Sequence, residues 1–362
     1  MTTITMMNEI LSTTDLKTAW AELRQAYPRM RTRDAAEHLG VSEAELLATG
    51  CGNAVTRLKP DWYTLFEALE GLGEVMALTR NDVCVHEKVG VYRNIERIPD
   101  HEMGMVLDEN VDLRLFFKHW HHAFAVVNGS DGQERRSLQF FDAHGTAVHK
   151  IHLRPESSMA HFEALVAQFR HEDQAATQAV LPPSAPRPER PEADIDVAGL
   201  REAWDALQDT HDFIFLLRRF KVGRVQALRL AGPRFARPVS TNSLRAILEQ
   251  AAEAELPIMV FVGNPGCVQI HSGPVHTLKA VEGWYNVLDP GFNLHVREAL
   301  IEGAWVVRKP TRDGDVHSLE CYDAAGDVVC YLFSKRKEGQ FESEAWRTLL
   351  HGLASSGETS TS

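Results

Sequence analysis

Short apolar runs bounded by glycine, asparagine and aspartate recur along the chain, and several are rich in valine, isoleucine, phenylalanine and cysteine. Runs of this length and composition are typical of β-strands. The clearest ones occupy residues 74–79, 82–89, 136–142, 256–263, 304–309 and 327–333. Residues 32–47 have helical spacing, and Gly145 lies in the turn of a predicted hairpin. The pattern predicts an α+β fold with large, mainly antiparallel sheets and helices that cover one face.

The pattern occurs twice. Residues 81–90 (NDVCVHEKVG) correspond to residues 264–273 (NPGCVQIHSG) at an offset of 183. Residues 137–148 (SLQFFDAHGTAV) correspond to residues 318–329 (SLECYDAAGDVV) at an offset of 181. Because the offset changes by only two residues over this span, we expect a tandem duplication into two structurally similar halves. Function should then lie where the two copies differ or meet.

A proline-rich segment separates the copies, with five prolines between Pro182 and Pro191 and almost no large apolar residue. Such a composition favours an extended, semi-rigid tether over a packed core. We therefore expect an N-terminal repeat at 1–172, a linker at 173–199, a C-terminal repeat at 200–354 and a disordered polar tail at 355–362.

Composition narrows the class of protein. A chain of 362 residues with 44% hydrophobic content is long enough for two cores. The start has no secretory pattern, and no uncharged apolar run is long enough for a membrane span, so a cytoplasmic protein is expected. A net charge of -12 argues against general binding of nucleic acids or anionic lipids. Five cysteines without a CxxC pair indicate buried thiols rather than disulfides or a zinc site.

Residues 32–47 also have the spacing of a helix-turn-helix, with Gly40 at the turn and Ser42 and Glu45 forming a capping box. The second helix, SEAELLATG, is acidic and lacks the side chains that read bases. A structural helical hairpin is therefore favoured over a DNA reader.

His211 follows Asp209 and Thr210 and precedes a segment with helical periodicity. Either of the two preceding residues is able to cap that helix, which would place His211 in its first turn. The positive end of the helix dipole favours neutral imidazole there, the form that serves as an axial iron ligand. The first copy has Trp20 at this position. A surface or capping role for His211 is the alternative.

Other polar positions also differ between the copies. Arg114 of the first copy stands where the second copy has His295, so the candidate ligand and the arginine belong to different copies. A single site at their junction would explain this distribution. A basic group is confined to the second copy: Arg218, Arg219, Lys221, Arg224, Arg229, Arg308 and Lys309. We expect an anionic ligand near Arg224 and Lys309, whereas a solvated helix face is an equal alternative for Arg218 and Arg219.

Five segments resemble one family along nearly the whole chain. They are residues 111–117 (VDLRLFF), 209–230 (DTHDFIFLLRRFKVGRVQALRL), 256–275 (LPIMVFVGNPGCVQIHSGPV), 286–301 (NVLDPGFNLHVREALI) and 305–320 (WVVRKPTRDGDVHSLE). Together they resemble the HemS-type cytoplasmic hemin-trafficking and hemin-degrading proteins of Gram-negative bacteria. The resemblance runs from Arg31 to Leu353 and fails only in the linker.

The resemblance implies a heme bound in a cleft between the two halves. Heme offers an apolar macrocycle, an iron that binds imidazole and two carboxylates that bind arginine or lysine. The positions that match the family's motifs are His211 for the iron ligand, Arg114 for the distal side, Arg224 and Lys309 for the propionates, and Phe261 and Tyr331 for the porphyrin. His86 matches a ligand proposed for a second heme, although its counterpart in the other copy is Gln269.

Two functions remain open at this point. As a carrier, the protein would accept heme from an inner-membrane transporter and deliver it to a heme oxygenase. As an enzyme, it would open the porphyrin itself, with Arg114 on the distal side and a partner reductase, because the sequence has no GxGxxG motif. A DNA-binding regulator is a third alternative. The histidine-rich segment 118–122 is interpreted as solvated rather than metal-binding.

Overall fold

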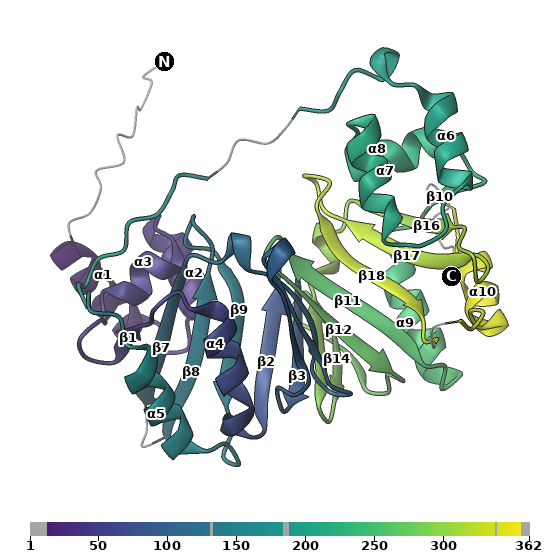
Figure 1. Cartoon of the computed structure of the whole chain (residues 1–362). Helices are drawn as coiled ribbons and strands as arrows, with labels where there is room; N and C mark the ends of the chain where they lie inside the picture. The colour runs from purple at the N-terminus through teal and green to yellow at the C-terminus, as the bar shows by residue number, and fades with distance from the viewer. Residues whose placement is uncertain (1–12, 131–132, 184–187, 337–338, 356–362) are drawn as a thin grey trace.

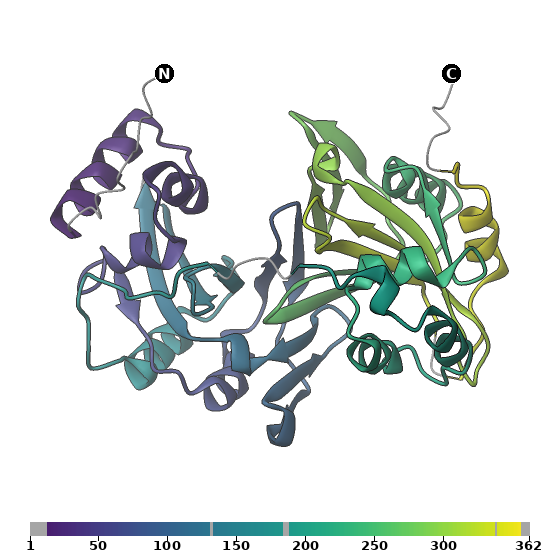
Figure 2. The ribbon, with the colours of Figure 1, turned by 90° about the horizontal axis from the view of Figure 1, so that it is seen from above.

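The computed structural model describes residues 13–130, 133–183, 188–336 and 339–355. Most of the predicted polar tail therefore lies outside the described residues. Figure 1 shows two lobes, with the helices α6 to α8 above the second lobe, and Figure 2 shows the two lobes side by side from above. The linker region is extended at residues 173–183 and 188–191 and ends in a short 3₁₀ helix, Glu192–Asp194.

Two nine-stranded antiparallel sheets form the centre of the molecule, as the sequence pattern predicts. In spatial order, the first sheet contains β1 (Val55–Arg57), β7 (His122–Ser130), β8 (Gln133–Phe141), β9 (Ala147–Leu153), β2 (Val75–Arg80), β3 (Cys84–Gly90), β15 (Phe292–Val296), β14 (Trp284–Asp289) and β13 (Leu278–Val281). The second sheet contains β10 (Ala236–Val239), β16 (Gly303–Lys309), β17 (Val316–Tyr322), β18 (Val328–Ser334), β11 (Ile258–Asn264), β12 (Cys267–Gly273), β6 (Asp112–Phe116), β5 (Met103–Leu107) and β4 (Ile95–Ile98).

The two copies exchange three strands each. Strands β13 to β15 come from the second copy, yet β15 pairs with β3 of the first copy, with Asn293 opposite Glu87. In return, β6 of the first copy pairs with β12 of the second, with Arg114 opposite Val268. In the sequence the linker separates the two repeats, but in the structure neither sheet is built from one repeat alone. Each sheet therefore depends on both copies for its hydrogen bonds.

Helices lie on both faces of each sheet, so the expectation that they cover one face is wrong. The helices are α1 (Thr13–Ala26), α2 (Thr32–Leu39), α3 (Glu43–Ala48), α4 (Trp62–Glu67), α5 (Met159–Phe169), α6 (Val197–Asp205), α7 (Asp212–Phe220), α8 (Arg224–Ala231), α9 (Ser243–Glu253) and α10 (Glu344–His351). Four further 3₁₀ helices are Ala68–Leu72, Pro99–His101, Phe117–His119 and Glu298–Leu300. In the second sheet, α9 and α10 pack on one face and α6 to α8 pack on the other.

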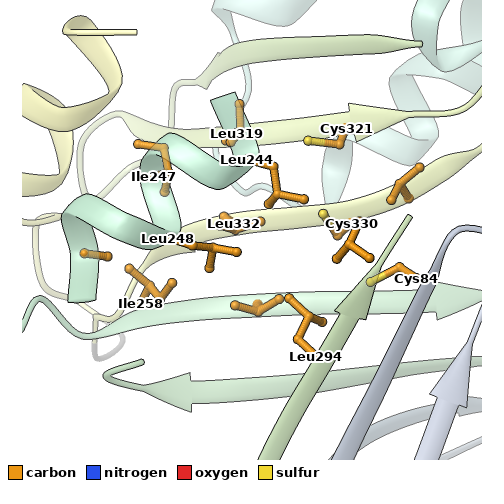
Figure 3. Packing of buried hydrophobic residues seen from close by; sticks show 14 of the residues in the cluster. Cys84, Leu244, Ile247, Leu248, Ile258, Leu294, Leu319, Cys321, Cys330 and Leu332 are labelled. Carbon is orange, nitrogen blue, oxygen red and sulfur yellow. The ribbon is translucent and has the colours of Figure 1, made fainter. Parts of the chain in front are cut away.

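The reason is that strand β16 directs apolar side chains to both faces of the second sheet. We call the helices α6 to α8 the three-helix cluster. Val307 of β16 contacts the cluster of α6 to α8, whereas Val306 packs toward the core of α9 and α10. Figure 3 shows that second core, in which Cys84 of the first copy lies beside Cys321 and Cys330. Four of the five cysteines are buried in strands and none of the five is in a disulfide, as predicted.

The helix-turn-helix spacing forms a helical hairpin. Helix α2 is followed by Gly40 in a left-handed conformation (φ 67°), and the predicted capping box of Ser42 and Glu45 begins α3. Five of the six residues of α3 are buried, so this helix has little surface with which to enter a DNA groove. The predicted helical hairpin and its capping box are confirmed.

Two asparagines at equivalent positions of the copies join the sheets. The side-chain amide of Asn81 donates to the carbonyl oxygen of Val329 at 2.9 Å, and its oxygen accepts from the backbone N–H of Cys84 at 2.8 Å. Asn264 reaches in the opposite direction and donates to the carbonyl oxygen of Val148 at 2.8 Å. This reciprocal pair holds the two halves together at the centre of the cleft.

We expect Asn81→Ala to lower the free energy of unfolding by about 2 to 3 kcal/mol, because several polar backbone groups lose their partners. Urea denaturation would measure the change. Asn53→Ala, at an exposed turn position, is the control and should stay within about 0.5 kcal/mol of the unmodified protein. A similarly small effect for Asn81→Ala would show that the pair does not hold the halves together.

Candidate functional site

The three-helix cluster leaves part of the second sheet uncovered, and we call this uncovered area the open face. Residues opposite one another on paired antiparallel strands point to the same side. Such pairs run across four strands in the series Ile270, Phe261, Tyr331 and Glu320. The rings of Phe261 and Phe333 lie 5.1 Å apart between centroids. The open face is thus an aromatic and aliphatic wall that ends at the buried carboxylate of Glu320.

A pocket of about 640 Å³ opens onto this wall from between the two halves. Phe261 and Tyr331 line it from the second sheet, and Arg33 of α2 lines it from the first copy. The residues predicted to contact a porphyrin therefore meet in a cleft between the halves. His211, Arg114, Arg224, Lys309 and His86 are outside the lining of this pocket.

His211 lies at the N-cap position of α7, one residue before the predicted first turn. The position was misjudged because Asp209 does not cap α7. Its carboxylate instead accepts from the backbone N–H of His211 at 2.8 Å and contacts the ring nitrogen Nδ1 at 2.7 Å. With the proton on Nδ1, the lone pair of Nε2 is presented outward. The side chain is 92% exposed, so Nε2 is free to bind a metal.

Arg114 lies on β6, at the exchanged end of the second sheet. Its guanidinium pairs with Asp112 and donates to the carbonyl oxygen of Leu113 at 3.2 Å. Its strand neighbour Val268 lines the pocket between the halves. The strand exchange therefore places an arginine of the first copy on the second sheet, on the same side as Val268. A role for Arg114 in a shared site stays a prediction.

Arg114→Ala should alter the exchange of small ligands more than the affinity for hemin, because a guanidinium stays charged and donates hydrogen bonds at any working pH. Azide titration of the hemin complex would measure the first effect, and hemin titration the second. Arg97→Ala, which removes an exposed arginine of β4, serves as the control. Equal azide affinity in the Arg114→Ala and Arg97→Ala proteins would remove Arg114 from the site.

Arg224 and Lys309 share one buried carboxylate, Glu320. Lys309 Nζ lies 2.5 Å from Glu320 Oε1, and Arg224 Nε lies 3.1 Å from Glu320 Oε2. The guanidinium also lies over the ring of Tyr331, at 4.6 Å. Lys309 is only 3% exposed, so Arg224 is the cation of this pair that reaches the open face. For Lys309, direct contact with a propionate stays a prediction and requires the side chain to move.

The cluster shifts the pKa values of its members. Burial opposes the charge of Glu320, but Arg224 and Lys309 outweigh it and hold the pKa of this carboxyl well below its usual range. Burial lowers the pKa of Lys309, which Glu320 partly restores. Sequence analysis missed Glu320, although a signal exists. The equivalent of Glu320 in the first copy is the neutral Gln139, and the equivalent of Lys309 in that copy is the neutral Asn128.

His86 is fully buried, and neither of its ring nitrogens has a hydrogen-bond partner among the residues that the structure describes. Its ring centroid lies 5.0 Å from that of Phe292 on the exchanged strand β15. Burial lowers the pKa of His86 well below its usual value. The ring is therefore neutral but closed off from solvent, and a role in binding a second heme stays a prediction that needs the strands to move.

The segment 118–122 was misread as wholly solvated. Trp120 is buried and donates from its indole N–H to the carbonyl oxygen of Gly266 at 2.8 Å.

Among the residues that the structure describes, no three His, Cys, Asp or Glu side chains gather to hold a metal ion. Over the same residues, every helix is too short or too polar to cross a bilayer.

Two interlocked nine-stranded sheets with a cleft between the halves define a class of tandemly duplicated α+β proteins. Residues 40–169 and 221–353 match the haemin-degrading HemS.ChuX domain. The chain belongs to the HemS family.

Known relatives cover almost the whole chain. The hemin transport protein HmuS of Yersinia pestis is 40% identical over 329 residues, which are 91% of this chain and 94% of HmuS. The crystal structure of the heme-binding protein holo-PhuS from Pseudomonas aeruginosa is 45% identical with a TM-score of 0.93, covering 95% of this chain and 99% of PhuS. The E. coli heme oxygenase ChuS is 35% identical with a TM-score of 0.84, covering 93% and 99%.

Proposed function

We propose that this protein is a cytoplasmic heme carrier that accepts imported heme and delivers it for iron release. The observation that carries the proposal is the geometry of His211. Asp209 holds Nδ1 of the ring at 2.7 Å and leaves Nε2 exposed. A carboxylate behind a histidine in this way orients the ring and increases its basicity toward a metal.

The residues of the site fit the chemistry of heme. His211 would hold the iron, and the wall of Phe261 and Tyr331 would contact the macrocycle. Arg224 would bind a propionate, since a guanidinium matches a carboxylate with two parallel hydrogen bonds. Arg114 would donate hydrogen bonds on the distal side. His211 and Arg224 come from the second copy and Arg114 from the first, so the site would draw its residues from both copies.

A second candidate function is heme degradation. Two observations favour it: one E. coli relative is named as a heme oxygenase, and Arg114 lies on β6 of the second sheet. Heme would supply the redox chemistry when bound, and an external donor would supply the electrons. In this function Arg114 would orient a small molecule through its N–H donors, and the apolar wall would exclude water from the distal side.

Titration of the full chain with hemin tests the proposal. A saturable Soret band at one hemin per chain is expected, and the absence of such a band would overturn it. Incubation of the complex with ascorbate and catalase then separates the two functions. A stoichiometric tetrapyrrole product that forms despite catalase supports degradation, whereas bleaching that catalase abolishes supports the carrier.

Partners follow from the carrier role. The donor would be an inner-membrane heme transporter and the acceptor a heme oxygenase, with a reductase added if the protein is an enzyme. Stopped-flow transfer of heme to a purified heme oxygenase would measure delivery. A transfer rate that rises with acceptor concentration supports direct contact, whereas a constant rate shows passive release into solution.

A further inference from the structure

A basic pocket lies on the side of the second sheet opposite the open face. Arg308 and Lys309 are consecutive in β16, so their side chains point to opposite faces of the sheet. Lys309 joins the buried cluster on the side of the open face, whereas Arg308 lines a pocket of about 310 Å³ on the other side. Its lining also includes the arginines Arg234, Arg237 and Arg347.

The four arginines converge from parts of the chain that are distant in sequence. They come from the loop before β10, from β10, from β16 and from α10, which meet at one edge of the second lobe (Figure 1). His317 and His351 complete the polar lining, and within the described part of the chain no aspartate or glutamate belongs to it. The remaining lining is apolar. In a chain with a net charge of -12, such a concentration of positive charge is distinctive.

Internal partners use only part of this charge. Arg234 pairs with Asp205 at 2.7 Å, and Arg308 pairs with Asp315 at 2.7 Å and with Asp205 at 3.5 Å. His317 Nδ1 lies 2.5 Å from the buried carboxylate of Glu342. The Nε atom of Arg308 is nevertheless enclosed and without a hydrogen-bond partner.

The positive charges of the other two arginines are less fully neutralised by neighbouring carboxylates. Among the residues that the structure describes, Arg237 donates to carbonyl oxygens at the end of α10, those of Leu350 at 2.8 Å and Leu353 at 3.2 Å, and has no carboxylate partner. Arg347 lies 3.7 Å from Glu344, which is 94% exposed, so solvent screens this pair strongly. Both guanidinium groups therefore retain charge for an external anion.

The pocket is specific to the second copy. The first copy has Val127 at the position of Arg308. The strand registers place Thr56 opposite Ala125 and Arg237 opposite Val306, so Thr56 is the counterpart of Arg237. Two of the four arginines therefore have no basic counterpart in the first copy.

We propose that this basic pocket binds a small polyanion that carries phosphoryl or carboxylate groups. Arginine matches both groups with paired hydrogen bonds. The volume is at the lower end of the range of about 300 to 1,000 Å³ for ligand pockets, which suits a small molecule. Nucleic acid is a poor match, because it requires a basic stripe along a surface, and here the cations surround one hollow.

Calorimetric titration of the full chain with pyrophosphate and, separately, with citrate tests this site. Saturable binding of at least one probe is expected beyond the effect of sodium chloride at equal ionic strength. Arg347→Gln should weaken that binding at least about tenfold, whereas Arg29→Gln, an exposed arginine of the first copy, should not change it. A preference for pyrophosphate identifies a phosphoryl ligand, and a preference for citrate identifies a carboxylate ligand.

Several results would overturn the proposal. One is that neither probe binds more tightly than chloride, and another is that Arg347→Gln binds both probes as the unmodified protein does. Binding of a glutamate-rich peptide without binding of either small anion would identify a protein-docking surface instead. Hemin titration of Arg347→Gln should match the unmodified protein, and a changed hemin affinity would refute a separate site. Thermal unfolding of each variant confirms that it is folded.

Discussion

His211→Ala should weaken hemin binding by at least about tenfold, or 1.4 kcal/mol, and should shift the Soret band. The reason is that the imidazole held by Asp209 is the proposed bond to the iron. Folding should be unaffected, because the side chain is exposed and substitutions at such positions change stability by about 0.5 kcal/mol or less. Hemin titration followed by absorbance, together with thermal unfolding, measures both quantities.

Two further variants sharpen this test. Asp209→Asn keeps the shape of the partner but removes its charge, so it should weaken hemin binding less than His211→Ala does. His38→Ala removes an exposed histidine at the end of α2 and should leave the titration unchanged. If His211→Ala retains both the Soret position and the affinity, the iron ligand is a different residue.

Glu320→Ala should lower the free energy of unfolding by about 3 to 5 kcal/mol, the range for breaking a buried ion pair. The carboxylate is fully buried and is shared by Arg224 and Lys309. Its loss leaves Lys309 as a buried charge without an anionic partner, while Arg224 loses its contact with Glu320. Urea denaturation measures the effect, and Glu302→Ala, at an exposed position, is the control. A loss below about 1 kcal/mol would mean that water replaces the carboxylate.

The same variant has a defined pH dependence. The folded pKa of Glu320 lies well below its usual value, so its contribution to stability is fully present above the unfolded pKa of about 4.3. The contribution is lost as pH falls from there toward the folded pKa. The difference in stability between the unmodified protein and Glu320→Ala should therefore narrow below about pH 4. A difference that stays constant down to pH 3 would contradict the assignment of the low pKa to this carboxyl.

Features that depend on a few neighbouring residues could be predicted from the sequence. The hairpin turn at Gly145 has the positive φ of 76° that glycine tolerates, and the capping box of Ser42 and Glu45 forms as its spacing indicates. The duplication itself followed from the offsets between the copies. In the candidate site, Phe261 and Tyr331 do line the cleft.

Other features could not be predicted, because they depend on partners that are remote in the sequence. A strand has the same apolar pattern whichever sheet it joins, so the exchange of β4–β6 and β13–β15 left no local signal. His86 looked like a candidate ligand in the sequence, but β15 brings Phe292 against it. Arg308 and Lys309 looked like one basic group, although the pleat of β16 sends them to opposite faces.

The sequence by itself determined the two copies, most of their strands and helices, the apolar character of the positions predicted to contact a porphyrin, and the family. These properties depend on side-chain type and on short-range backbone preferences. The tertiary structure alone decided which strands share a sheet, that Arg114 of the first copy lies on the second sheet, and that Glu320 holds two cations in the interior. The physical reason is that burial, ion pairing and pKa shifts arise from distances between segments that only the folded chain brings together.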